Sequence, residues 1–149
     1  MNWLLRFIAT GFFVGEKVPF APGTAGTALA ALIYFLFFPV EAGFYWPMLL
    51  LVTFIGIISA GRTEEIMKEI DPPQVVIDEI LGYFIAMAFL PKTFGLALAG
   101  FIIFRFFDIL KIFPINKLEI VAGGLGIMID DICAGIITNI ILQLAVRFF

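Results

Sequence analysis

Two pairs of adjacent acidic residues stand in stretches of sequence that are otherwise apolar. The pairs are Asp78 with Glu79 and Asp130 with Asp131. Burying one carboxylate in hydrocarbon is costly, so two side by side demand a metal ion, a cation or water as a partner. Carboxylate oxygens are ligands that hard divalent cations prefer. The pairs therefore predict a divalent metal site, against the alternative that the first pair only complements a helix dipole.

A glycine follows each acidic pair, Gly82 in the first segment and Gly135 in the second. Because glycine has no side chain, it lets a second helix approach the backbone closely. Neighbouring residues on a helix point about 100° apart, so two adjacent carboxylates cannot easily hold one ion in the same way. One member of a pair then binds the metal, while the other binds a second metal, orients water or pairs with an arginine.

A third cluster combines basic and acidic residues at helical spacing. Arg105, Asp108 and Lys111 are three residues apart, which places them along one face of a helix. A guanidinium group grips phosphate oxygens in a bidentate manner, and a lysine adds a point charge. The alternative is an ion pair within the helix that neutralises a charge in the membrane. The cluster by itself does not decide between these interpretations.

Two further segments offer groups that bind phosphate. In residues 22–27, Thr24 and Thr27 share a face if a helix begins there, although simple helix caps explain this segment taken alone. The glycine-rich loop before the second acidic pair leaves the amides of Gly123, Gly124 and Gly126 free to meet an anion at a helix N-terminus. An anion-binding loop beside a carboxylate pair indicates phosphate together with a divalent cation.

The composition places these clusters in a membrane protein. Of the 149 residues, 62% are hydrophobic and 14% are charged, whereas soluble domains average about 45–50% and about 25%. We expect one membrane-embedded domain over residues 1–149, an all-α polytopic helix bundle with about four or five spans and an N-terminal interfacial helix. The lipid bilayer is then a partner, whereas the lack of a basic run argues against nucleic acid.

Breaks in the hydrophobic pattern define the expected helices. The N-terminal helix covers residues 2–14, and prolines and glycines in residues 15–27 interrupt regular structure. Later apolar helices are expected at residues 28–38, 48–60, 75–90, 94–110 and 127–146. Residues 62–73 are expected to be exposed to water, and residues 114–126 to form a loop. Several apolar runs are shorter than the roughly 20 residues that span a bilayer upright, so some helices are expected to be re-entrant or half-buried.

The basic residues set an orientation if the chain crosses the membrane five times. One side then holds Arg6, Lys17, Arg62, Lys68, Lys111 and Lys117, and the other holds Lys92 and Arg147. By the positive-inside rule, the first side is the cytoplasm. The same arrangement puts all four polar clusters at the cytoplasmic ends of helices, which predicts a single site at that surface.

In their order and spacing, the four motifs resemble those of one family, phosphatidylglycerophosphatase A. They are Pro-Gly-Thr-Ala-Gly-Thr (22–27), Asp-Glu-Ile-Leu-Gly (78–82), Phe-Arg-Phe-Phe-Asp-Ile-Leu-Lys-Ile-Phe-Pro-Ile (104–115) and Gly-Gly-Leu-Gly-Ile-Met-Ile-Asp-Asp-Ile-Cys-Ala-Gly (123–135). The resemblance extends from about Phe7 onward. It implies a Mg²⁺-dependent phosphatase of the bacterial cytoplasmic (inner) membrane. Such an enzyme removes the terminal phosphate of phosphatidylglycerophosphate, a membrane phospholipid, and releases phosphatidylglycerol and inorganic phosphate.

We hypothesise a role for each cluster. Mg²⁺ binding and water activation fall to Asp78, Glu79, Asp130 and Asp131. Arg105 and Lys111 would hold the transferred phosphoryl group, with Asp108 as an orienting group or a further ligand. The rest of the phosphate site would come from Thr24, Thr27 and the amides of Gly123, Gly124 and Gly126.

Other phosphatase chemistries lack their residues in this chain. There is no histidine, and so neither a phosphohistidine intermediate nor a zinc site of the usual kind. The single cysteine, Cys133, has Asn139 instead of arginine six residues on, so the cysteine-phosphatase loop is missing. No Asp-x-Asp sequence occurs, which removes the aspartyl-phosphate arrangement. Metal-assisted hydrolysis remains.

Two other functions are alternatives to the prediction of a metal-dependent lipid phosphatase. A transporter of ions or protons uses intramembrane acids as a relay, and it requires carboxylates at staggered depths across the membrane. A lipid phosphate transferase also uses membrane aspartates and a metal, but its long multi-aspartate signature is not present.

Overall fold

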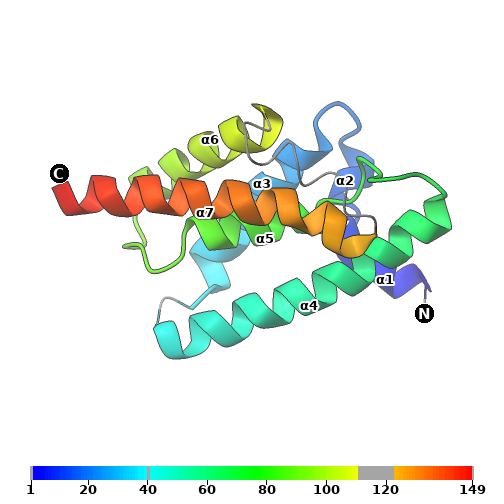
Figure 1. The fold of residues 1–149 in the computed structure, drawn as a ribbon, viewed down its shortest axis with the longest axis horizontal. Helices are drawn as coiled ribbons and strands as arrows, with labels where there is room; N and C mark the ends of the chain where they lie inside the picture. The colour runs from blue at the N-terminus through cyan, green and yellow to red at the C-terminus, as the bar shows by residue number, and fades with distance from the viewer. Residues whose placement is uncertain (1, 40, 111–122, 149) are drawn as a thin grey trace.

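The computed structural model describes residues 2–39, 41–110 and 123–148, and in these ranges the regular elements are all α-helices. They are α1 (Asn2–Ala9), α2 (Val14–Lys17), α3 (Pro22–Phe37), α4 (Ala42–Met67), α5 (Ile77–Ala86), α6 (Phe94–Leu110) and α7 (Gly124–Phe148). The short helix α5 contacts α3, α4, α6 and α7, and Figure 1 shows it behind α7 and between α4 and α6. The predicted all-α fold class is confirmed.

Two of the described helices, α4 and α7, are long and apolar enough to cross a membrane. This is fewer than the four or five spans predicted from the sequence. At 16 and 17 residues, α3 and α6 are shorter than the roughly 20 residues that an upright span needs. The outer face of α4 exposes large apolar side chains, among them Leu50, Phe54 and Ile58. Apolar surface of this extent fits contact with lipid, as expected of a membrane protein.

Helix α5 ends at buried residues, where side chains of α7 bond to backbone carbonyl groups. The side-chain amide of Asn139 donates hydrogen bonds of 2.9 Å to the carbonyl oxygens of Ala86 and Ala88, and Gln143 donates a third to Ala88. In an apolar environment a helix can end only where such partners exist. The predicted helix over residues 75–90 is therefore too long at both ends.

Two glycines bring α5 and α7 into backbone contact. A Cβ atom built on Gly82 would lie 2.7 Å from the carbonyl oxygen of Asp131, and one built on Gly135 would overlap the carbonyl oxygen of Gly82. Because any side chain here would push the helices apart, the expectation that these glycines let helices touch is confirmed. The contact places Asp131 next to the first turn of α5.

Helix boundaries differ from the sequence predictions mainly in the first half of the chain. The first helix ends at Ala9 instead of residue 14, because Gly11, Phe12 and Phe13 adopt positive φ angles. Helix α3 begins at Pro22, since proline is well tolerated in the first turn of a helix, so residues 22–27 are helical and not an irregular break. Helix α4 is longer than predicted at both ends, whereas the predicted range 94–110 matches α6.

Candidate active site

Four helix segments that are far apart in sequence meet at one end of the bundle. The beginnings of α3 and α5, the end of α6 and the first turns of α7 line a cavity of about 470 Å³. Its polar lining residues are Thr24, Asp71, Asp78, Glu79, Arg105, Asp108, Asp130 and Asp131. The structure thus brings together the polar segments that the sequence separates by more than 100 positions.

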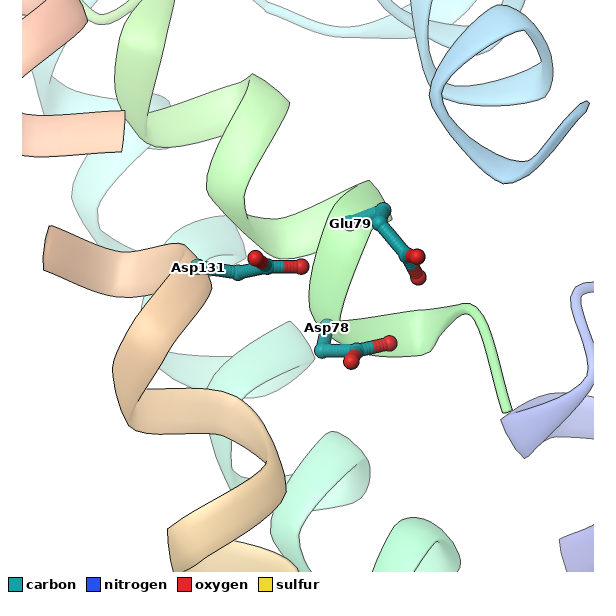
Figure 2. Close-up of side chains that lie close together, drawn as sticks. All are labelled: Asp78, Glu79 and Asp131. Carbon is teal, nitrogen blue, oxygen red and sulfur yellow. The ribbon is translucent and has the colours of Figure 1, made fainter. Parts of the chain in front are cut away.

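Three carboxylates that line this cavity lie close to one another. Asp78 and Glu79 come from the first turn of α5, and Asp131 reaches across from α7 (Figure 2). One oxygen atom of each lies within 4.8 Å of one oxygen of each of the others, a spacing that fits three ligands of one metal ion. Asp78 and Asp131 are buried, with exposed fractions of 9% and 3%, and the side chain of Glu79 is 13% exposed.

The environment of these carboxylates favours a cation. Within the described residues, Asp78 Oδ1, Glu79 Oε2 and Asp131 Oδ2 are buried and have no hydrogen-bond partner. A buried acceptor without a partner loses its hydration, and no hydrogen bond compensates for that loss. The loss is especially costly for a charged group. Oxygen-rich, anionic sites of this kind suit Mg²⁺ or Ca²⁺. The three side chains therefore fit a hard divalent cation.

The protonation of the cluster leads to the same expectation. Helix α5 has ten residues and is too short to cross a membrane. Burial, and then the neighbouring charge of Asp131, raises the pKa of Glu79 to about 8. Burial also raises the pKa of Asp78 well above its ordinary value, with the charge of Glu79 adding to the effect. Without a cation these carboxyls retain protons that a divalent ion would displace.

Arg105 is the single basic side chain among the described lining residues of the cavity, which also include six acidic ones. Its Nη1 atom lies 3.7 Å from Glu79 Oε1 and also pairs with the carboxylate of Asp108. Gly23 in α3 packs directly against this pair, because a Cβ atom there would overlap Glu79 Oε1 and lie 2.9 Å from Arg105 Nη1. The arginine is thus held beside the carboxylates, where it can meet an anion.

The predicted metal ligands are not all equivalent in the structure. Asp130 lines the cavity but does not belong to the group of three whose oxygens converge. Adjacent residues on α7 point in different directions, so Asp130 and Asp131 reach different parts of the site. Asp108 also lines the cavity, where it pairs with Arg105.

The predicted phosphate-binding groups are only partly brought to the cavity. Thr24 lines it, but Thr27 is fully buried, and its hydroxyl donates a hydrogen bond of 2.9 Å to the carbonyl oxygen of Gly23. The remaining predicted groups are Gly123, Gly124, Gly126 and Lys111. None of the three glycines is a lining residue; Gly124 packs on α4 against the carbonyl oxygen of Ile57. Lys111 lies outside the described residues.

Sequence reasoning missed one acidic residue of the cavity, Asp71. It belongs to the polar segment after α4, which the sequence marks as exposed to water. The following Pro72 and Pro73 restrict the backbone, and Asp71 itself has a positive φ of 49°. That turn directs the segment back over the site, and the two prolines were the available signal.

Comparisons with known proteins identify the family of the chain. A family model described as phosphatidylglycerophosphatase A matches residues 7–146. The chain is 36% identical to proteins named phosphatidylglycerophosphatase A from Escherichia coli and Haemophilus influenzae, over 89% and 92% of this chain and 78% and 85% of theirs. It is 39% identical to a protein of Bacteroides thetaiotaomicron named "Putative phosphatidylinositol-3-phosphatase", over 97% of this chain and 94% of that one.

No solved structure matches the chain. The sequence matches nevertheless cover almost its whole length, including all four segments that meet at the cavity. The chain belongs to the phosphatidylglycerophosphatase A family, a family of phosphatases.

Proposed function

We propose that this protein hydrolyses the terminal phosphate of phosphatidylglycerophosphate in a Mg²⁺-dependent reaction at the cytoplasmic face of the bacterial inner membrane. The products are phosphatidylglycerol and inorganic phosphate. The observation that carries the proposal is the convergence of Asp78, Glu79 and Asp131, with unpartnered buried oxygens, beside Arg105. Family membership supports the substrate, because two relatives carry the name of this activity.

The chain's own residues divide the work. Asp78, Glu79 and Asp131 would hold Mg²⁺. When bound, the ion polarises the phosphate and lowers the pKa of a water molecule. Arg105 binds the phosphate oxygens and neutralises charge that develops as the phosphorus–oxygen bond to the glycerol breaks. Asp108 and Asp130 also line the cavity, and one of them would accept the proton of the attacking water and pass it to the leaving alkoxide, which becomes an alcohol.

The position of the site favours a lipid enzyme over a transporter. A relay requires acids at several depths of the membrane. Here the acidic side chains of α5, α6 and α7 line one cavity. The charged residues Lys92 and Arg147 belong to the loop before α6 and to the last turn of α7, away from this cavity.

A second candidate substrate is phosphatidylinositol 3-phosphate. The observation in favour of this substrate is the relative named "Putative phosphatidylinositol-3-phosphatase". That protein is 39% identical to this chain over 97% of this chain's length. Both lipids present a phosphate monoester on a membrane-anchored headgroup, so the cation and Arg105 would act on either in the same way. The headgroup beyond the phosphate must then decide between them.

The test is phosphate release by the purified protein in mixed micelles that contain one phosphorylated lipid at a time. The panel contains phosphatidylglycerophosphate, phosphatidylinositol 3-phosphate and phosphatidic acid, each with Mg²⁺ and with a chelator. We expect the highest kcat/KM with phosphatidylglycerophosphate and no release after chelation. Preference for the inositol lipid would transfer the proposal to the second candidate. No release from any lipid at any Mg²⁺ concentration would overturn it.

A further inference from the structure

A second cavity of about 440 Å³ forms a groove between α3 and α6, and all its lining residues are apolar. The α3 side contains Ala28, Ala31 and Phe35, and the α6 side contains Ala97, Leu98 and Phe101. Ala97 is buried, whereas Leu98 is 49% exposed, so the groove is open to the surroundings of the bundle along its length. Its lining offers nothing to a polar ligand.

The groove continues the polar cavity along α6. The residues of α6 that line the groove and then the cavity include, in order, Phe94, Leu98, Phe101, Arg105 and Asp108. Their spacings of four, three, four and three residues follow one face of a helix. The side chains thus change from apolar to charged on a single stripe, and the change falls between Phe101 and Arg105.

Helix α3 shows a similar change, but it runs from the polar cavity into the groove, whereas α6 runs from the groove to the cavity. Thr24 lines the polar cavity, and Ala28, Ala31 and Phe35 follow at spacings of four, three and four residues in the groove. Because α3 and α6 contact each other, the two stripes bring the apolar groove within about one helical turn of the polar cavity. The cavity can bind phosphate, and the groove can contact only hydrocarbon.

The dimensions fit one leaflet of a bilayer. From Ala28 to Leu36 the groove follows α3 over eight residue-to-residue steps, or about 12 Å at 1.5 Å per step. Half of the hydrocarbon core of a bilayer is about 15 Å thick. We propose that the groove between α3 and α6 holds an acyl chain of the phospholipid whose phosphate is bound in the polar cavity.

This assignment rests on the proposed function, since it concerns the lipid on which the site acts. In a bilayer the chain gains little from leaving other lipid tails, because those tails are as apolar as the groove. Binding therefore depends on packing contacts and on the headgroup, which is covalently attached and holds the chain at the entrance. A second copy of the protein or an apolar peptide could fill the groove, but neither would place a phosphate in the adjoining polar cavity.

The first experiment fills the groove and compares two lengths of substrate. Ala31→Trp places a large side chain in the α3 stripe, and Ala28→Trp does so at an exposed position that disturbs packing least. The matched control is Ala42→Trp, at an exposed position in the first turn of α4. Kinetics are measured with phosphatidylglycerophosphate that carries long acyl chains and with a soluble dibutanoyl analogue of the same headgroup.

We expect both groove variants to raise KM for the long-chain lipid roughly fivefold or more, because lost packing contacts are individually small but add up. KM for the dibutanoyl analogue and kcat for both substrates should stay within about twofold of the unmodified protein, as should all values for the control. Equal KM changes for both substrates, or none, would overturn the inference and leave the proposed function intact. Failure of the unmodified protein to hydrolyse either substrate would refute both the inference and the proposed function.

The second experiment locates the acyl chain directly in the unmodified protein. A phosphatidylglycerophosphate with a diazirine at mid-chain is photolysed in bilayers, and the labelled peptides are identified by mass spectrometry. We expect labels on residues 28–36 and 94–101, suppressed by excess unlabelled substrate but not by phosphatidylcholine. Labels spread evenly over α4 and α7 would contradict the inference. An unlabelled groove, as expected if a second copy of the protein closes it, would also contradict the inference.

Discussion

At the scale of single residues, Arg105 supplies the one positive charge among the described residues that line the cavity. It pairs with Glu79 and Asp108 while six acidic side chains surround the same space. Arg105→Met keeps the length of the side chain but removes the charge that binds phosphate. We expect kcat/KM for phosphate release to fall by about a hundredfold or more, as for loss of a main transition-state donor. Arg105→Lys should recover only part of this, because an ammonium group cannot bind two oxygens in the guanidinium geometry.

The chain contains a matched control for this change. Arg62 pairs with Glu65 at the same three-residue spacing, but on an exposed part of α4. Exposed ion pairs contribute little, so Arg62→Met should leave kcat/KM within about twofold of the unmodified protein. Equal losses in both variants would show that Arg105 has only a general structural role.

The raised pKa of Glu79, about 8 because of burial and then the charge of Asp131, predicts how Mg²⁺ activation depends on pH. Below pH 8 the carboxyl holds a proton that the metal must displace, so metal binding weakens as pH falls. The Mg²⁺ concentration for half-maximal activity should fall by up to about tenfold per pH unit from pH 6 to 8 and level off above 8. Titrations of phosphate release with Mg²⁺ at several pH values measure this. A half-saturation constant independent of pH would contradict it.

At the scale of helices, the contact between α5 and α7 sets the distance between the metal ligands. Gly135→Ala would place a Cβ atom against the carbonyl oxygen of Gly82 and shift α7, which carries Asp131. We expect the Tm in detergent to fall by about 2–8 °C, as for overpacking by one methyl group. The Mg²⁺ requirement for phosphate release should rise at the same time, because Asp131 moves away from α5.

Gly95 provides the control for that substitution. It also lies in an apolar helix, α6, but a Cβ atom there meets no other atom within 4 Å. Gly95→Ala should therefore leave the Tm and the Mg²⁺ requirement unchanged or slightly improved. If the two alanine variants behave alike, the close contact of α5 and α7 does not position the ligands.

Some helices could be predicted from the sequence because local signals define them. Helix α6 has its predicted bounds because Pro91 and an apolar run mark its beginning and its length. Helix α5 was predicted too long because the amides that cap its end, on Asn139 and Gln143, lie more than 50 residues away. The number of spans was overestimated for a related reason, since apolar runs do not reveal which helices stop within the bundle.

At the scale of the whole molecule, the arrangement of charges predicts an orientation that can be measured. Lys68 and Glu69 follow α4 at the end of the bundle that the sequence assigns to the cytoplasm, and Thr93 precedes α6 at the other. In a Cys133→Ala background, Glu69→Cys should resist a membrane-impermeant maleimide in intact cells and react after lysis. Thr93→Cys should react in intact cells. The reverse pattern would place the site on the outer face.

The sequence predicted the residue types of the site better than their geometry. The acidic pairs and Arg105 were recognisable because charged residues in apolar runs are costly. It could not show that Asp131 but not Asp130 meets the acids of α5, since that depends on the rotation of α7 at its contact with Gly82. Nor could it show that Thr27 bonds to its own helix, or that Asp71 returns to the cavity.

We propose that Asp78, Glu79 and Asp131, from two helices, would hold one cation at a site that hydrolyses lipid phosphate. The most direct measurement is the Mg²⁺ dependence of phosphate release from phosphatidylglycerophosphate by Asp131→Asn, with Glu69→Gln as an exposed control. Asparagine has the size of aspartate, so the variant should fold in membranes. Its activity should fall by more than about a hundredfold. Loss of a residue that binds the metal directly should cost more than loss of a residue that only hydrogen-bonds to a ligand, which typically costs about 10–100-fold. Near-normal, Mg²⁺-dependent activity in Asp131→Asn would contradict the account.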